Sequence, residues 1–297
     1  MKKKLLYLIL ISFINILAVL PTSLRRGFFF CLSRILYFCG RKTNKIIKAN
    51  LDFVFENQLS NERIKEIQKY TYFNMLQWVR SVIENSSVTA DEIKQNVSIQ
   101  NREIIDNLLK ENKKVIIISA HYGNLEMLGA YLNRFVSPMV QVARKSNFDL
   151  LDNYLTKSRE RSGAKIVYKE GALRHLIKAI MKNKVVSLII DQNITPKDSV
   201  EVELLGKKVN QTISATILAR KFGAYIVPVA IFNEDNFRYN IKVYDAIAPI
   251  KTDDVDSDNK KLTQLQADAL SKIIHEDPKQ WFWAHKRFKG HNKEIYE

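Results

Sequence analysis

The chain has 297 residues, a formal net charge of +16 and 46% hydrophobic residues, which permits one large domain or two small ones and excludes global disorder. Only two cysteines, Cys31 and Cys39, are present, so a disulfide framework is excluded and both thiols are expected to be reduced. The histidines and cysteines do not have zinc-ligand spacing, and we expect neither a metal nor a cofactor.

The N-terminal region predicts an association with a membrane. Residues 5–20 read LLYLILISFINILAVL, an apolar run somewhat shorter than the about 20 residues of a bilayer span. Ten lysines and arginines but no acidic residue precede Asp52, and they are interleaved with aliphatic and aromatic residues. An uncleaved anchor or an interfacial helix fits this pattern better than a signal peptide, because no small-x-small cleavage site follows. We expect residues 1–50 to form an apolar, basic anchor region on an anionic membrane and residues 51–297 to form the main domain.

Helices are predicted next along the chain, followed by an alternation of strands and helices. The first helices are expected over residues 35–54, 61–83 (with Ser60 or Asn61 as N-cap) and 102–112. The expected strands are 115–119, 139–143, 165–168, 185–190, 225–232 and 239–244. The expected helices among and after them are 124–133, 148–162, 172–183, 212–222 and 260–275. This alternation indicates an α/β fold, a mixed sheet flanked by helices, with an N-terminal helical membrane-associated segment.

An acidic cluster at residues 253–258 resembles the start of a calcium-binding loop. Asn259 stands where such a loop needs glycine, and Leu265 stands where it needs a bidentate glutamate. We therefore expect a solvated surface loop rather than a metal site.

A histidine and a glutamate stand at the exit of the first predicted strand, in the stretch VIIISAHYGNLEMLG (residues 115–129). Functional groups of open α/β sheets gather outside the carboxyl ends of strands, which is where His121 lies. Gly123 permits a sharp turn, so that the Glu126 carboxylate can accept a hydrogen bond from one imidazole nitrogen and leave the other free as a base. Such a pair suits the deprotonation of a hydroxyl, although the spacing alone also fits a structural pair at a helix N-terminus.

Four ordered blocks carry a resemblance to a known family. His121-Tyr-Gly-Asn-Leu-Glu126 resembles the His-x4-Asp/Glu motif of the glycerolipid and lipid A acyltransferases. Three further blocks resemble the late-acyltransferase branch of lipid A biosynthesis: Arg144-Lys-Ser-Asn147 with Arg159 and Gly163, Asp191-Gln192 with residues 201–206 (EVELLG) and Thr212, and residues 278–289 (PKQWFWAHKRFK). The resemblance covers about residues 115–289.

This resemblance implies a glycerolipid acyltransferase-like domain that moves a fatty acyl chain from acyl carrier protein to a hydroxyl of a lipid A precursor, without an acyl-enzyme. It implies His121 and Glu126 as catalytic residues, and Arg144, Asn147, Arg159, Asp191 and Gln192 as candidates for substrate binding. The acidic carrier protein, the phosphorylated acceptor and an anionic membrane all suit a basic enzyme. Basic residues flank the apolar run on both sides, so charge does not fix its orientation. The cysteine usage and this chemistry favour the cytoplasmic face of the inner membrane.

Two alternatives stay open at this point. The first keeps the chemistry and changes the acceptor to a glycolipid, a lysophospholipid or an amino-lipid. The second is a non-catalytic basic protein that binds membrane or nucleic acid. No nucleic acid partner is expected, because the chain has no nucleic-acid-binding motif and much of its basic excess lies among apolar residues.

Overall fold

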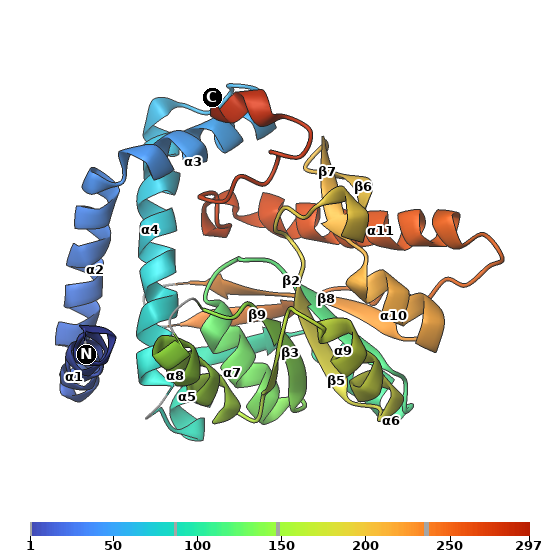
Figure 1. Cartoon of the computed structure of the whole chain (residues 1–297), viewed down its shortest axis with the longest axis horizontal. Helices are drawn as coiled ribbons and strands as arrows, with labels where there is room; N and C mark the ends of the chain where they lie inside the picture. The colour runs from blue at the N-terminus through green and yellow to red at the C-terminus, as the bar shows by residue number, and fades with distance from the viewer. Residues whose placement is uncertain (1, 86–87, 147–148, 235–237) are drawn as a thin grey trace.

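Helices cover both faces of a central sheet, and further helices from the N-terminus stand at one side of it (Figure 1). The computed structural model describes residues 2–85, 88–146, 149–234 and 238–297. The helices are α1 (Lys2–Val19), α2 (Thr22–Cys39), α3 (Arg41–Val54), α4 (Asn61–Glu84), α5 (Ala90–Asn96), α6 (Glu103–Lys110), α7 (Leu125–Phe135), α8 (Asp149–Glu160), α9 (Ala172–Met181), α10 (Ser214–Phe222) and α11 (Val255–Glu276). Three short 3₁₀ helices are η1 (Pro196–Asp198), η2 (Pro278–Gln280) and η3 (Lys293–Tyr296).

The sheet has seven strands and is mostly parallel. Its strands are β1 (Val97–Gln100), β2 (Val115–Ser119), β3 (Met139–Ala143), β4 (Lys165–Tyr168), β5 (Val185–Ile189), β8 (Tyr225–Asn233) and β9 (Tyr239–Val243), in the order β1-β9-β8-β2-β5-β3-β4. Only β8 and β9 pair antiparallel, which makes the sheet mixed and confirms the predicted fold class. In the register of β2 and β5, Ser119 lies opposite Ile189, so the residues that follow these two central strands emerge side by side.

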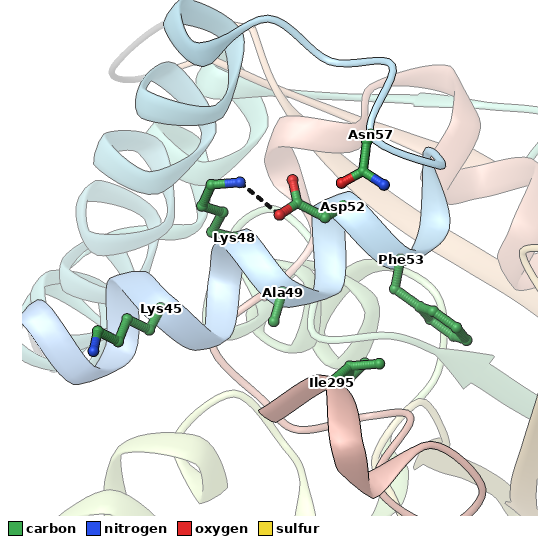
Figure 2. A pocket seen from close by; sticks show the side chains of 7 residues that line it. All are labelled: Lys45, Lys48, Ala49, Asp52, Phe53, Asn57 and Ile295. Carbon is green, nitrogen blue, oxygen red and sulfur yellow. Dashed lines mark hydrogen bonds and ion pairs between the residues drawn. The ribbon is translucent and has the colours of Figure 1, made fainter. Parts of the chain in front are cut away.

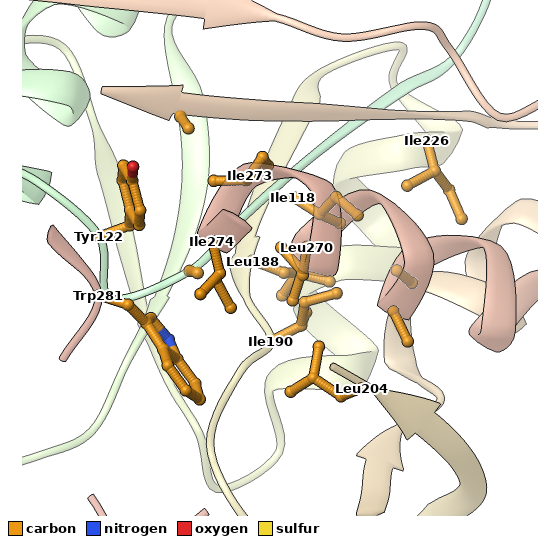
Figure 3. Packing of buried hydrophobic residues seen from close by; sticks show 14 of the residues in the cluster. Ile118, Tyr122, Leu188, Ile190, Leu204, Ile226, Leu270, Ile273, Ile274 and Trp281 are labelled. Carbon is orange, nitrogen blue, oxygen red and sulfur yellow. The ribbon is translucent and has the colours of Figure 1, made fainter. Parts of the chain in front are cut away.

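Burial on both faces explains why the strands read as continuous apolar runs. On one face Ile116 and Ile118 pack with α9, α10 and α11, and Figure 3 shows Tyr122 and Trp281 at the end of this cluster. On the other face Ile117 packs with α5, α6 and α7. The core therefore lies on both sides of β2, and it fixes the point at which this strand ends.

The N-terminal helix pair, α1 and α2, packs against α4. Ile14, Leu17 and Phe29 of the pair are buried with Leu76 and Ile83 of α4. In Figure 1 the pair lies on the far side of α4 from the sheet. Within the described residues, no helix combines the length and the apolarity that crossing a bilayer requires.

The predicted strands over residues 115–119, 139–143 and 165–168 are confirmed residue for residue, and Ser60 caps α4 as predicted. The single helix predicted over residues 35–54 is wrong, because Gly40 separates α2 from α3. The sequence did not predict α5, β1 or the two strands of the antiparallel hairpin, β6 (Ser199–Leu204) and β7 (Lys207–Thr212). This hairpin turns at Leu205 and Gly206, both with positive φ. Thr212 belongs to β7, so the helix predicted from this residue begins later, at Ser214.

The prediction of a solvated loop at the acidic cluster is wrong from Val255 onward, where α11 begins, although Asp253, Asp254 and Asp256 are exposed. Asp254 caps α11 by accepting a hydrogen bond from the Ser257 backbone N–H (2.9 Å), so the helix begins at Val255. Asp258 is buried and binds the Arg220 guanidinium at 2.8 Å. The acidic residues thus serve the N-terminus of a helix, where the helix dipole favours negative charge.

Candidate active site

A tight turn after β2 presents His121. Gly123 in this turn has φ +52°, and a Cβ atom there would collide with the backbone carbonyl oxygen of Ile231, so the position requires glycine. Hydrogen bonds fasten the turn from two directions. The Trp78 indole N–H of α4 donates to the Gly123 carbonyl (2.6 Å), and the Phe282 backbone N–H donates to the His121 carbonyl (2.9 Å).

Asp191 is the carboxylate that meets the imidazole. It follows β5, the strand paired with β2, and its Oδ1 lies 2.8 Å from His121 Nδ1. Its Oδ2 accepts from the His121 backbone N–H (2.9 Å) and from the Trp281 indole N–H (2.8 Å). Burial raises the pKa of Asp191, but His121 and these hydrogen bonds outweigh it and lower this pKa to about 2.

This arrangement fixes the tautomer of His121. The charged carboxylate of Asp191 accepts a hydrogen bond from Nδ1, so Nδ1 carries the proton and Nε2 carries an unprotonated lone pair. Nε2 lies 3.3 Å from the side-chain nitrogen of Gln192, on the exposed side of the ring. Burial lowers the pKa of His121, yet Asp191 outweighs this effect and the net pKa is raised above 6.5. The imidazole is therefore prepared to accept a proton at Nε2.

Glu126 does not pair with His121, and the predicted hydrogen bond between them is wrong. Both ring nitrogens of His121 face other residues, and both oxygens of Glu126 are held by Arg159. Arg159 Nε and Nη2 lie 3.1 and 2.6 Å from the two carboxylate oxygens, a bidentate geometry. The physical reason is orientation: Glu126 lies in the first turn of α7, which directs its side chain toward the last turn of α8, where Arg159 lies.

The remaining predicted residues are distributed around this edge of the sheet. Gln192 lies beside the imidazole, as described above. Arg144 directly follows β3, which is parallel to β5 and next to it, so its exposed side chain emerges at the same edge as His121. Asn147 lies outside the described residues.

The C-terminal segment supplies positioning groups that the sequence reasoning did not assign. Trp281 is buried, and its indole N–H orients Asp191. Arg287 is buried and donates to the Gln192 carbonyl (3.2 Å), and burial lowers its pKa to about 10. His285 Nε2 accepts from the Asn193 backbone N–H (2.9 Å). The sequence signal for these positioning groups is the aromatic and basic block at residues 278–289. The spacing within this block does not indicate which strand end the block contacts.

The described residues gather no metal-ligating cluster at the turn after β2, and the cavity between α3 and η3 lies away from this turn. Across the described part of the chain, no three histidine, cysteine or acidic side chains come together in a way that could hold a metal ion. A cavity of about 460 Å³ lies between α3 and η3, and Figure 2 shows its lining, with Lys48 paired to Asp52. This cavity contains none of the residues of the turn after β2.

Comparison with known proteins identifies relatives of one kind. A sequence profile described as bacterial lipid A biosynthesis acyltransferase matches residues 1–290. The chain is 26% identical to the lipid A biosynthesis lauroyltransferase of Escherichia coli K12 over 254 residues, which cover 84% of this chain and 80% of the relative. It is 22% identical to the palmitoleoyltransferase of the same strain (84% and 79% covered). It is 19% identical to a lipid A biosynthesis acyltransferase of Haemophilus influenzae (92% and 84% covered).

Proposed function

Because this chain belongs to the bacterial lipid A biosynthesis acyltransferase family and transfers acyl chains to a lipid A precursor, we propose that acyl carrier protein is the donor and that His121 is the general base. The observation that carries this mechanism is the Asp191–His121 pair, which leaves Nε2 unprotonated at the exposed side of the ring. Asp191 orients the imidazole and stabilises the imidazolium that forms, as the carboxylate does in hydrolase triads.

The acyl group passes directly from the donor to the acceptor, through one tetrahedral intermediate. The acceptor hydroxyl gives its proton to His121 Nε2 as its oxygen attacks the thioester carbonyl carbon. The C–O bond forms, the C–S bond breaks, and the proton passes from the imidazolium to the thiolate of the donor. No acyl-enzyme is needed, and Ser119, the hydroxyl two residues before His121, is buried within β2.

The tetrahedral intermediate needs a donor for its oxyanion, and Gln192 supports this role. Its amide nitrogen lies 3.3 Å from Nε2, on the side of the ring from which the acceptor hydroxyl must approach. A side-chain amide there can donate to the oxygen that develops charge. Arg287 holds the backbone of the same residue and thereby fixes where this amide begins.

The two arginines suit an anionic acceptor. Glu126 binds Arg159 in a fixed orientation near the catalytic turn. The partly exposed guanidinium can still contact an anionic group there. Arg144 emerges at the same sheet edge and is exposed, so we assign it to the phosphorylated headgroup of the acceptor. In this mechanism Glu126 acts through Arg159 and not on the imidazole.

We place the protein on the cytoplasmic face of the inner membrane, and the N-terminal helix pair supports the interfacial part of this proposal. The pair exposes a set of large apolar side chains: Phe13, Ile16, Val19, Leu24, Phe28, Phe30, Ile35 and Phe38. The next helix, α3, exposes basic residues: Arg41, Lys42, Lys45 and Lys48. An apolar surface bordered by lysine and arginine is what an anionic bilayer binds.

The mechanism is tested with purified enzyme, acyl carrier protein loaded with a fatty acid, and a panel of acceptors. The panel contains a lipid A precursor, a glycolipid, a lysophospholipid and an amino-lipid. We expect transfer to the lipid A precursor and its loss in His121→Ala, with an unchanged circular dichroism spectrum. Turnover near the wild-type rate by His121→Ala would contradict the mechanism, and exclusive transfer to another lipid would contradict the acceptor.

Membrane binding is tested with vesicles of phosphatidylethanolamine and phosphatidylglycerol. Ile35→Asp with Phe38→Asp should weaken vesicle binding more than tenfold, because burying one large apolar side chain contributes about 1.5–3 kcal/mol. The matched control is Met181→Asp with Leu265→Asp, two exposed apolar residues on α9 and α11. Equal losses in both double variants would show that the binding surface lies elsewhere.

A further inference from the structure

Arg25 joins the N-terminal helix pair to α4. Its Nη1 donates to the carbonyls of Leu17, Ala18 and Leu20 (3.2, 3.1 and 3.1 Å), at the end of α1, where carbonyls lack helical partners. Its Nε donates to Oε1 of Glu84 at 3.0 Å. Arg25 is only 8% exposed, so this contact is screened little by solvent. One guanidinium therefore sets both the end of α1 and its attachment to α4.

Glu84 continues the connection into the interior. Its other oxygen lies 3.5 Å from Arg80 Nε, one helical turn earlier in α4. Arg80 is 2% exposed, and its Nη2 donates to the Tyr239 hydroxyl of β9 at 2.9 Å. The connection thus crosses from the N-terminal helices to the central sheet through buried polar groups.

Asn124 carries the connection into the catalytic turn. Its side-chain nitrogen donates to the same Tyr239 hydroxyl (3.1 Å) and to the Ser81 hydroxyl of α4 (2.8 Å). Its Oδ1 accepts from the Met127 backbone N–H and caps α7. Asn124 is fully buried and lies between His121 and Glu126 in the chain. The cap that sets the start of α7 is therefore held by the last turns of α4.

We propose that residues 80–85, the last turn of α4 and its C-cap, are a positioning element. This element couples the N-terminal helix pair to the catalytic turn, so that seating the pair on a lipid surface orders the turn and raises turnover. Asn85 supports this assignment, because its side-chain nitrogen donates to the Glu126 backbone carbonyl (3.4 Å). The turnover part of this inference rests on the proposed function, whereas the ordering of the turn does not.

The charge balance makes Glu84 the sensitive point. Arg25, Arg26 and Arg80 lie around this one carboxylate, and burial together with Arg80 lowers the pKa of Arg26 to about 10. Neutralising Glu84 removes a counter-charge from buried guanidinium groups, which destabilises their present arrangement. Because Arg80 and Asn124 share the Tyr239 hydroxyl, a displaced Arg80 disturbs the cap of α7.

The experiment uses the full chain with Glu84→Gln and Tyr239→Phe. Their matched controls are Glu276→Gln and Tyr244→Phe, which break another Glu–Tyr contact, at the far end of β9, where the Tyr244 hydroxyl donates to Glu276 (2.8 Å). Hydrogen exchange of the peptide covering residues 121–128 is followed with and without the phosphatidylglycerol-containing vesicles. Steady-state kinetics are measured on the same preparations.

In the wild-type chain, vesicles should slow exchange over residues 121–128. In Glu84→Gln and Tyr239→Phe we expect roughly tenfold faster exchange there and no response to vesicles, while peptides of α11 exchange as in wild type. We expect kcat to fall by about 10- to 100-fold with the KM for the acyl donor unchanged, the usual cost of misplacing a catalytic group by about 1 Å. Vesicle binding should persist, because the apolar surface is intact.

Three results would overturn the coupling. They are a wild-type turn that does not respond to vesicles, variants that match their controls, and exchange that rises uniformly over the chain, which indicates global destabilisation alone. Should Glu84→Gln fail to fold, Tyr239→Phe, which removes one oxygen, decides the question. Should wild-type enzyme show no acyl transfer, the proposed function fails, while the exchange measurements still test the coupling.

Discussion

Replacing Asp191 with asparagine tests the tautomer argument most directly. The carboxylate accepts three hydrogen bonds, two at Oδ2 and one at Oδ1. An asparagine oxygen can keep the two bonds from the His121 backbone and Trp281, which places its NH₂ group against Nδ1. The NH₂ group donates there, so the imidazole proton moves to Nε2 and the base is lost. The shape of the site is preserved while its chemistry is reversed.

The expected loss in kcat is large. The same substitution in the Ser-His-Asp triad lowers kcat by about 10⁴ through the wrong tautomer, and a positioned acid–base group contributes about 10²–10⁴. We therefore expect Asp191→Asn to lower kcat by about 10²–10⁴, or roughly 2.7–5.4 kcal/mol.

The pH dependence gives a second, independent sign. A base must be neutral, so wild-type kcat/KM should fall as pH drops through the raised pKa of His121, above 6.5. Without the Asp191 charge, burial alone acts on the imidazole and lowers its pKa, so the residual activity of Asp191→Asn should persist to lower pH. The pair's contribution to stability through His121 is fully present below about pH 6.5 and is lost as pH rises through the raised pKa.

The assay is steady-state acyl transfer between pH 5 and 9, with thermal unfolding as the control for folding. A variant that keeps more than a tenth of wild-type kcat with an unchanged pH profile would refute the tautomer argument.

Three further predictions follow from single contacts. Gln192→Ala should lower kcat by about 10²–10³ with little change in KM, the cost of removing one oxyanion donor, and a change confined to KM would remove Gln192 from that role. Arg144→Ala should raise the KM for the acceptor by roughly 10- to 100-fold, from about 1.5–3 kcal/mol per charge-assisted contact, and Arg144→Lys should restore it only in part; a rise in the donor KM alone would contradict the assignment. Asp258→Asn should lower the thermal midpoint with kcat per folded molecule unchanged, because Asp258 binds Arg220 and Thr252. The Thr252 backbone hydrogen bond is the first cause of the lowered pKa of Asp258, so wild-type stability should fall as pH drops below about 4.

Local patterns in the sequence decided much of the fold. Four β-branched apolar residues followed by Ser119 determined β2, and the next two strands along the chain, β3 and β4, begin and end where the periodicity changes. The hairpin of β6 and β7 was not predicted, although buried Val202 and Leu204 alternate with exposed Glu201 and Glu203 as a hairpin with one buried face requires. The start of α11 was missed because acidic residues mark a helix N-terminus as well as a solvated loop.

By itself the sequence determined that His121 stands at a strand exit with Gly123 beside it, and it determined the family. Only the tertiary structure decided which carboxylate meets the imidazole. Glu126 is five residues away in the chain, but the start of α7 turns it to Arg159; Asp191 is seventy residues away, and the pairing of β2 with β5 brings it to 2.8 Å. The order of strands in a sheet depends on how whole helices and strands pack, and spacing along the chain does not encode it.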